Sequence, residues 1–334
     1  MMRLVLLGFI FSFLISCDSE PQLVELTGEA LGTGYRVQFY SSERFEVVEK
    51  FDSTIAAINK SMSTYLEDSD ISKINDGDTT IVIEPMFRDV LALSRKIYNA
   101  TDGYFDPTVG ILVNAYGFGP EKQIKVLDSV VLDSLRAYVG LDKIKLSREG
   151  RIIKENKAVY LDFNSIAKGY SIDRLGKMLE NNGVENYLIE LGGELLAKGK
   201  NLDKNQTWRV GIENIDSPLN NRDFTEAVEL QNRGMAGSGN YRKFRIDSTT
   251  GKRYVHTINP LTGKAEKSDI LSATVIATTC AEADGFATAF MALGLEKSKQ
   301  VLNRHQDLEA YFIYADKDST AIFKSKGFSN FIVK

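Results

Sequence analysis

The stretch from residue 256 to residue 294 constrains the fold more than any other part of this sequence. It reads HTINPLTG, then the apolar run SDILSATVIATT, then CAEADGFATAFMALG. The apolar run predicts a strand, and the last segment predicts a helix that begins near Cys280. Thr279 and Glu282 have the spacing of a capping box at the helix start, and Gly294 supplies the stop.

Two oxygen-bearing side chains stand one turn apart on this predicted helix. Asp284 and Thr288 are at positions i and i+4, so both point from the same helical face. Such a pair can hold a hard cation such as Mg²⁺, which prefers oxygen ligands. The alternative is structural: Asp284 is an acid favoured by the helix dipole, and Thr288 is a packed side chain.

Composition narrows the class of protein. The chain has 334 residues, 43% hydrophobic and 26% charged, with a formal net charge of −4. No basic run breaks the mixed charge pattern, so we expect no nucleic-acid partner. The sequence contains no GxxxxGK[ST], GxSxG, CxxC or HExxH motif. With only His256 and His305, a histidine-rich metal site is excluded by count.

The N-terminus has the pattern of an export signal. Arg3 precedes LVLLGFIFSFLIS, an apolar run too short for a comfortable membrane span but suitable for a signal peptide. It ends in Leu-Ile-Ser-Cys, which resembles a bacterial lipobox with Cys17 as the lipidated residue. A plain signal peptide with an incidental cysteine is the alternative. We expect a signal peptide over 1–16, a tether over 17–26 and an exported, membrane-anchored lipoprotein, with Cys280 as a small buried residue.

The remaining chain predicts an α+β fold with many strands and unevenly spaced helices. No linker divides it, so we expect one domain over 27–334. Helices are predicted over 43–60, 86–100, 131–140, 165–183, 280–294 and 296–305, with a loop over 61–75. Strands are predicted within 22–40, 158–163, 186–200, 208–215, 226–237, 243–258, 268–279, 308–316, 320–325 and 331–334.

Several polar loops carry acids that suit a bound nucleotide diphosphate. Asp106 precedes Pro107, and Asp162 stands at a predicted strand end. Ser165 then opens the next helix, with Lys168 in its first turn. Amide groups at a helix start favour an anion such as a pyrophosphate. Together with the Asp284–Thr288 pair, these loops suggest a nucleotide bound with Mg²⁺.

Seven motifs make the chain resemble the ApbE family of FAD:protein FMN transferases. In order they are MSTYLEDSDISKIN, DGYFDPTVGILVNAYGFG, LDFNSIAKGYSID, LIELGGELLAKGK, GSGNY, HTINPLTG and TVIATTCAEADGFATAFMALG. The resemblance covers about residues 27–334. It implies a T-fold-like α+β module with mixed or antiparallel sheets and packed helices. It also implies Mg²⁺-dependent cleavage of FAD, attachment of FMN to a threonine and release of AMP. The implied acceptors are subunits of membrane redox complexes.

The resemblance also implies roles for single residues. Asp284, Thr288 and Ser165 match the family's metal ligands, and His256 begins the HxIxPxTG segment near the reaction centre. The general base is left open between His256 and a metal-bound carboxylate such as Asp284. Three departures stand at Asn164-Ser165, Asn259 and Gly237. The implied contacts with the flavin nucleotide are Leu31, Tyr65, Tyr104, Phe105, Asp106, Asp162, Lys168 and Ile258.

Other functions use the same residues. A Mg²⁺-dependent FAD pyrophosphatase would differ only in using water as the acceptor. A lipoprotein that binds flavin without chemistry would need no metal, so the presence of both Asp284 and Thr288 argues against it. The segment DGFATA over 284–289 faintly resembles an acceptor pattern, but it falls in the predicted metal helix.

Overall fold

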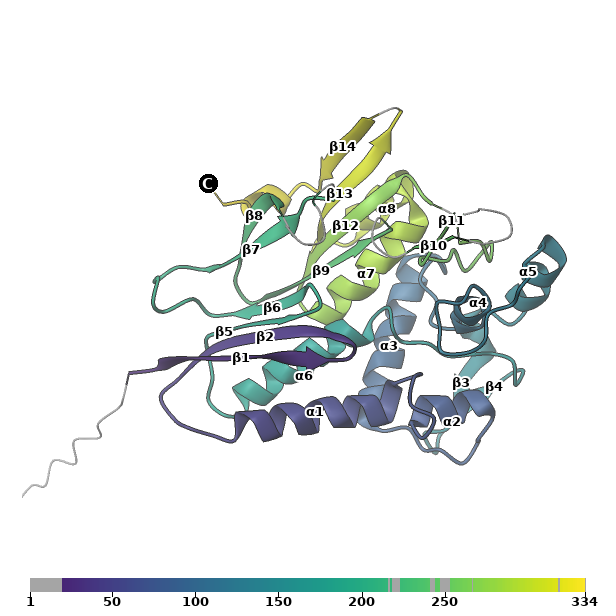
Figure 1. Ribbon diagram of the computed structural model, residues 1–334, viewed down its shortest axis with the longest axis horizontal. Coiled ribbons are helices and arrows are strands. Elements are labelled where there is room, and N and C mark those ends of the chain that lie inside the picture. Colours follow the sequence, from purple (N-terminus) through teal and green to yellow (C-terminus); the bar gives the residue numbers. More distant parts are fainter. Residues whose placement is uncertain are drawn as a thin grey trace, which may run out of the picture.

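An antiparallel sheet of eight strands is the largest element of the fold (Figure 1). The computed structural model describes residues 20–215, 217, 223–240, 244–246, 253–265, 267–317 and 319–333. Every neighbouring pair of strands in this sheet is antiparallel. In spatial order the strands are β1 (Gln22–Ala30), β2 (Thr33–Ser41), β5 (Tyr187–Leu191), β6 (Glu194–Lys198), β9 (Arg233–Gly239), β12 (Ile270–Ala277), β13 (Glu309–Asp316) and β14 (Ser319–Lys324).

The helices that cover one face of this sheet include α1 (Val47–Met62), α6 (Ala167–Glu180) and α7 (Cys280–Leu293) (Figure 1). The alternation of the strands explains the contact, because side chains such as Val37 and Phe39 turn one apolar row of β2 toward the helices. The other helices are α2 (Asp70–Asp76), α3 (Pro85–Ala100), α4 (Gly110–Ala115), α5 (Ser129–Arg136) and α8 (Leu295–Arg304), with 3₁₀ turns at Leu141–Lys143 and Phe328–Asn330.

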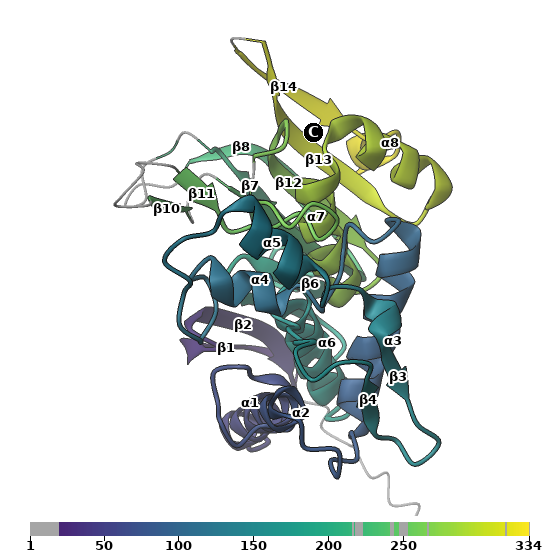
Figure 2. The same cartoon turned by 90° about the vertical axis from the view of Figure 1, so that its right-hand side faces the viewer.

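The opposite face of the sheet packs against a hairpin of β7 (Trp208–Glu213) and β8 (Phe224–Leu230). Trp208 and Leu230 share a core there with Met235 and Ile276 of the sheet. A further segment between α3 and α6 lies at one end of the helical layer, at the right in Figure 1 and facing the viewer in Figure 2. It carries α4, α5 and the pair β3 (Ile144–Leu146) and β4 (Ile152–Lys154); β10 (Phe244–Ile246) pairs with β11 (Arg253–Val255).

The main sheet splits between β6 and β9. Their pairing covers only Leu195–Ala197 with Arg233–Met235, whereas β9 pairs with β12 as far as Gly239. Among the described residues, the edge of β9 from Ala236 onward therefore has no strand partner on the β6 side. The turn from β5 to β6 uses Gly192 and Gly193 at φ +67° and +105°, a conformation that favours glycine.

The predicted α+β class and its antiparallel sheets are confirmed. The predicted strand and helix of the stretch from residue 256 to residue 294 are confirmed, and the Thr279 hydroxyl caps the helix by accepting a hydrogen bond from the Glu282 N–H at 3.2 Å. The reciprocal half of the capping box is absent among the described contacts. The Glu282 carboxylate forms an ion pair with Lys96 of α3 instead.

Three local predictions were wrong. The loop expected over 61–75 contains α2, which Ser69 caps by accepting from the Ser72 N–H at 3.1 Å. The strand expected over 158–163 is an irregular segment, because the Asn75 side chain binds both the N–H and the C=O of Leu161, at 2.8 Å each, in place of a neighbouring strand. Over 331–333 the chain makes one bridge, from Ile332 to Val228, rather than a strand.

The predicted signal peptide over 1–16 and the lipidation residue Cys17 lie outside the described residues. Within the described part of the chain, no helix has the length and apolar character needed to cross a membrane. Cys280 is fully buried, as expected, and burial raises the pKa of its thiol.

Candidate active site

A cavity of about 870 Å³ occupies the split in the sheet and continues on both of its faces. On the helical side it is bordered by the start of α6 and by one face of α7. On the other side it is bordered by the β7–β8 hairpin. Every sequence-predicted site residue lines this cavity except Leu31.

Leu31 lies in the two-residue turn between β1 and β2, at φ +51°. Its side chain packs against the core cluster under β2 and α6. The structure therefore does not bring Leu31 to the cavity wall, because the turn directs it into the neighbouring core.

Asp284, Thr288 and Ser165 all border the cavity. Asp284 is only 6% exposed. Its Oδ2 accepts a hydrogen bond from the Gly169 N–H at 3.0 Å. Burial, reinforced by the charge of Glu194 and opposed by that of Lys168, raises the pKa of this carboxyl to about 7. A buried carboxylate with this environment favours a bound cation.

Close packing of α7 against α6 and β9 places Asp284. A Cβ atom at Gly169 would lie 2.4 Å from the Cys280 carbonyl oxygen, and one at Gly234 would lie 2.3 Å from the Cys280 backbone nitrogen. The Asp173 carboxylate of α6 completes the junction by accepting from the N–H groups of Cys280 at 2.8 Å and Ala281 at 2.9 Å. Gly169 and Gly234 therefore allow the first turn of α7 to pack closely, and Asp173 holds it in place through two hydrogen bonds.

The donor set fits a magnesium ion better than a softer metal. No group of three or more His, Cys, Asp or Glu side chains suited to a metal occurs in the described part of the chain. The oxygens of Asp284, Thr288 and Ser165 are the hard donors that Mg²⁺ binds, and Mg²⁺ commonly uses few protein ligands plus phosphate and water. The residues present fit the implied metal.

Glu194 is a site residue that the sequence reasoning did not single out. It is 3% exposed and its Oε1 lies 2.5 Å from the Lys168 Nζ. Burial lowers the pKa of Lys168, but Glu194 and Asp284 outweigh it, and the net shift is upward. Lys168 therefore stays protonated at the cavity wall. The available signal was the acid that directly follows Gly192-Gly193 within the predicted strand range 186–200.

The start of α6 presents backbone donors to the same space. Asn164, Ser165 and Lys168 line the cavity. No described residue accepts a hydrogen bond from the backbone N–H of Ser165 or Lys168, whereas the Asn164 N–H binds Asp162 Oδ1 at 2.7 Å. Free amides at a helix start, next to a protonated lysine, are suited to binding an anion.

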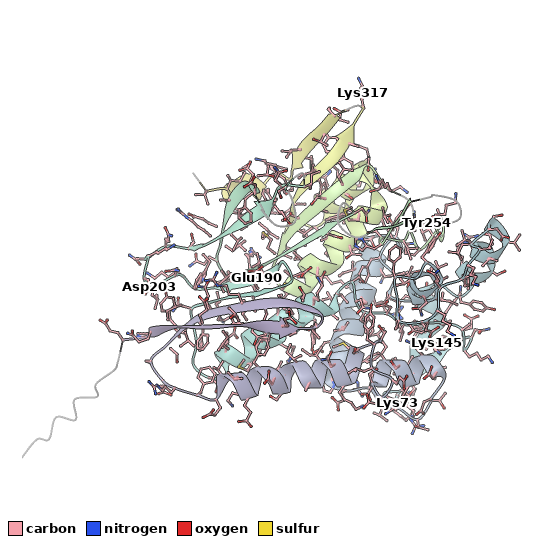
Figure 3. All side chains as sticks on the ribbon, viewed as in Figure 1. Lys73, Lys145, Glu190, Asp203, Tyr254 and Lys317 are labelled. Atoms are coloured by element: carbon pink, nitrogen blue, oxygen red, sulfur yellow. The ribbon has the colours of Figure 1, made fainter. Side chains whose placement is uncertain are left out.

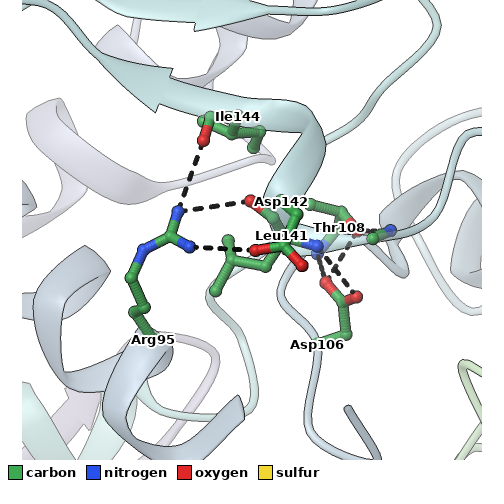
Figure 4. Close-up of polar contacts among 7 residues, drawn as sticks. Arg95, Asp106, Thr108, Leu141, Asp142 and Ile144 are labelled. Carbon is green, nitrogen blue, oxygen red and sulfur yellow. Dashed lines mark hydrogen bonds and ion pairs between the residues drawn. The ribbon is translucent and has the colours of Figure 1, made fainter. Parts of the chain in front are cut away.

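Asp106 supports the cavity wall through contacts within the protein (Figure 4). Its Oδ1 accepts from the N–H and hydroxyl of Thr108 at 2.8 and 2.6 Å, and its Oδ2 accepts from the Leu141 N–H at 3.2 Å. Arg95 holds the same 3₁₀ turn through the carbonyls of Leu141 and Ile144. Burial raises the pKa of Asp106 to about 6. These contacts make Asp106 a support of the loop that borders the predicted flavin site.

The predicted aromatic contacts differ in exposure. Tyr65 is 61% exposed, whereas Phe105 is 2% exposed and belongs to the main core. The Lys297 ammonium lies 4.5 Å from the centre of the Tyr104 ring. Tyr65 is therefore the predicted aromatic residue with the most open ring for stacking against a flat ligand. His256 and Ile258, which follow β11, also line the cavity.

The fold matches that of solved flavin transferases. A structure named flavin transferase ApbE from Vibrio cholerae aligns with a TM-score of 0.83 and 30% identity, covering 93% of this chain and 99% of that one. The apo flavinyl transferase ApbE of Pseudomonas stutzeri aligns with a TM-score of 0.82 and 30% identity, covering 93% and 97%.

The family assignment rests on sequence as well. The model of the ApbE family matches residues 31–312. The FAD:protein FMN transferase of Haemophilus influenzae is 35% identical over 93% of this chain and 94% of its own length, and that of Escherichia coli K12 is 32% identical over 96% and 95%. The chain belongs to the ApbE family.

Proposed function

We propose that this chain is a Mg²⁺-dependent FAD:protein FMN transferase. The observation that carries the proposal is the convergence of Asp284, Thr288 and Ser165 on the cavity that also receives the free amides of α6. Relatives that share nearly the whole chain and bear this enzyme name support the transferase class. The metal and the threonine acceptor are the finer parts of the proposal.

Different residues of the cavity bind FAD, hold the metal and accept the proton in the proposed reaction. The start of α6 and Lys168 bind the FAD pyrophosphate, and Tyr65 stacks on the flavin ring. When bound, Mg²⁺ held by Asp284, Thr288 and Ser165 supplies charge neutralisation and alignment of the phosphates. His256, at the cavity wall, takes the proton of the acceptor hydroxyl. The acceptor oxygen forms a bond to the FMN phosphorus, and the bond from that phosphorus to the departing AMP breaks.

Location follows from the N-terminal pattern. We propose that Cys17 carries lipid and that the enzyme acts on subunits of membrane redox complexes outside the cytoplasm. The lipobox-like Leu-Ile-Ser-Cys sequence supports this part of the proposal.

The test supplies FAD, Mg²⁺ and purified chain to membranes from a host strain that lacks the gene for this chain. We expect a flavin-fluorescent protein band, and mass spectrometry should find FMN on a threonine. Asp284→Asn, which keeps the side-chain shape, should lower the rate by about 10²-fold or more, because it removes the charged metal ligand. FMN release that is as fast without acceptor, with no labelled protein, would make the chain a pyrophosphatase.

A further inference from the structure

The half of the cavity on the hairpin side holds none of the predicted flavin or metal residues. This half is the sheet-face groove, and its wall includes Gln38, Glu190, Phe224, Gly237 and Thr274. Glu190, labelled in Figure 3, lies on β5. The predicted residues come instead from α6, α7 and the loops beside the helices.

The alternation of side chains along β9 and β12 shows which residues lie on each face of the main sheet. Met235 and Ile276 belong to the core under the β7–β8 hairpin, so Gly237 and Thr274, two residues away on the same strands, share that face. The alternate residues Ala236 and Ala273 belong instead to the core cluster that contains α7. The groove and the metal residues thus lie on opposite faces of the sheet, joined through the opening between β6 and β9.

The opening presents an unused strand edge to the groove. Beyond Met235, the β6-facing edge of β9 has no backbone partner among the described residues. An extended peptide pairs readily with such an edge. Gly237 leaves room for it, since a Cβ atom added there would meet nothing within 4 Å, and its backbone is not left-handed.

An exposed aromatic ring marks the rim of the groove. Phe224 is 64% exposed and lies across Gly211 of the paired strand, where an added Cβ would come within 2.1 Å of its ring. Aromatic residues are enriched at the centres of protein–protein contacts.

We propose that the sheet-face groove receives an extended segment of the flavin-accepting protein. The segment pairs with the free edge of β9 beside Gly237, and its hydroxyl residue reaches through the opening toward Asp284 and Thr288. This inference rests on the proposed transferase function, which requires a protein substrate to reach the metal side. A nucleotide has no peptide backbone whose N–H and C=O groups could pair with the edge of β9. The free edge therefore favours a peptide as the occupant of the groove.

Gly237→Val tests the inference because its side chain adds bulk to the groove at a position where a Cβ atom meets nothing within 4 Å. The control is Ala227→Val, which places the same valine side chain at an exposed position of β8 outside the cavity. The probe is the acceptor domain identified by the membrane labelling, purified without flavin. Gly237→Val should raise the KM for this acceptor about tenfold or more. The Kd for FAD and the slow FMN release without acceptor should match those of the wild type and the control.

Phe224→Ala is a second test variant, which removes a side chain from the groove instead of adding one. It should raise the acceptor KM and leave the Kd for FAD unchanged. If Gly237→Val weakens FAD binding in step with transfer, the groove holds part of the nucleotide and the inference is wrong. If both variants transfer like the wild type, the acceptor docks elsewhere. If the wild type labels no acceptor, the proposed transferase function is wrong. The proposal that an acceptor segment binds in the groove would then be wrong as well.

Discussion

Asp106 illustrates how one side chain can be both buried and fully engaged. Its carboxylate accepts three hydrogen bonds, which favour the charged form, yet burial outweighs them and raises its pKa to about 6. In an unfolded chain an aspartate titrates near pH 4. The folded protein therefore binds the proton of Asp106 more tightly than the unfolded chain does.

The shift predicts a stability that depends on pH. The contribution of Asp106 to folding is fully present below about pH 4 and is lost as pH rises through about 6. Asp106→Asn removes this titration. The free energy of unfolding of the wild type, relative to Asp106→Asn, should fall by about 1–3 kcal/mol between pH 4 and pH 7. Urea denaturation at both pH values measures it. A difference that grows with pH would show that the three hydrogen bonds dominate.

At the scale of elements, the junction of α6, α7 and β9 decides the geometry of the proposed metal site. Asp284 lies one turn into α7, so any movement of the first turn displaces its carboxylate. Gly169 is the tightest position on α6, because a Cβ there would meet the backbone of Cys280, which cannot move aside as a flexible side chain can.

Gly169→Ala should therefore destabilise the protein, although glycine to alanine within a helix ordinarily stabilises it. We expect a loss of about 1–3 kcal/mol in the free energy of unfolding, as for other overpacked positions, and slower FMN transfer. Gly237→Ala is the control for stability alone, since its added carbon enters open space. Denaturant unfolding compares the two variants. A Gly169→Ala variant more stable than the wild type would show that the junction relaxes without cost.

At the scale of the whole molecule, the proposed lipid anchor at Cys17 and the main sheet lie close together along the chain. β1 begins at Gln22, so only residues 18–21 separate it from Cys17. A fully extended chain spans about 3.5 Å per residue, so lipid on Cys17 would hold the edge of the main sheet within about 20 Å of the bilayer. The active-site cavity would then work near membrane-bound acceptors.

Cys17→Ala tests the anchor. The wild type should partition into the membrane fraction and dissolve only with detergent, because acyl chains add apolar area that favours the bilayer. Cys17→Ala should be unprocessed or released. Cys280→Ala controls for loss of a cysteine, since that thiol is buried. A native protein that is soluble with Met1 intact would contradict the lipoprotein proposal.

The local sequence pattern was sufficient to predict many helices and strands and part of the candidate site. The periodicity of α1 and α3 and the capping of α7 by Thr279 are set by neighbours in sequence, so they could be predicted. The shared direction of Asp284 and Thr288 follows from helical geometry alone. The seven motifs extended the prediction to residues that no spacing rule connects.

Tertiary contacts decided the rest, because they join residues whose separation in sequence leaves no periodic trace. Asn75 replaces a strand partner for Leu161, which turned a predicted strand into an irregular segment. Glu194 meets Lys168 only because β6 and α6 pack together. The opening beside Gly237 exists only because β6 and β9 stop pairing after a few residues. Local propensity and helical spacing act over a few residues, whereas the cavity depends on how distant strands and helices pack.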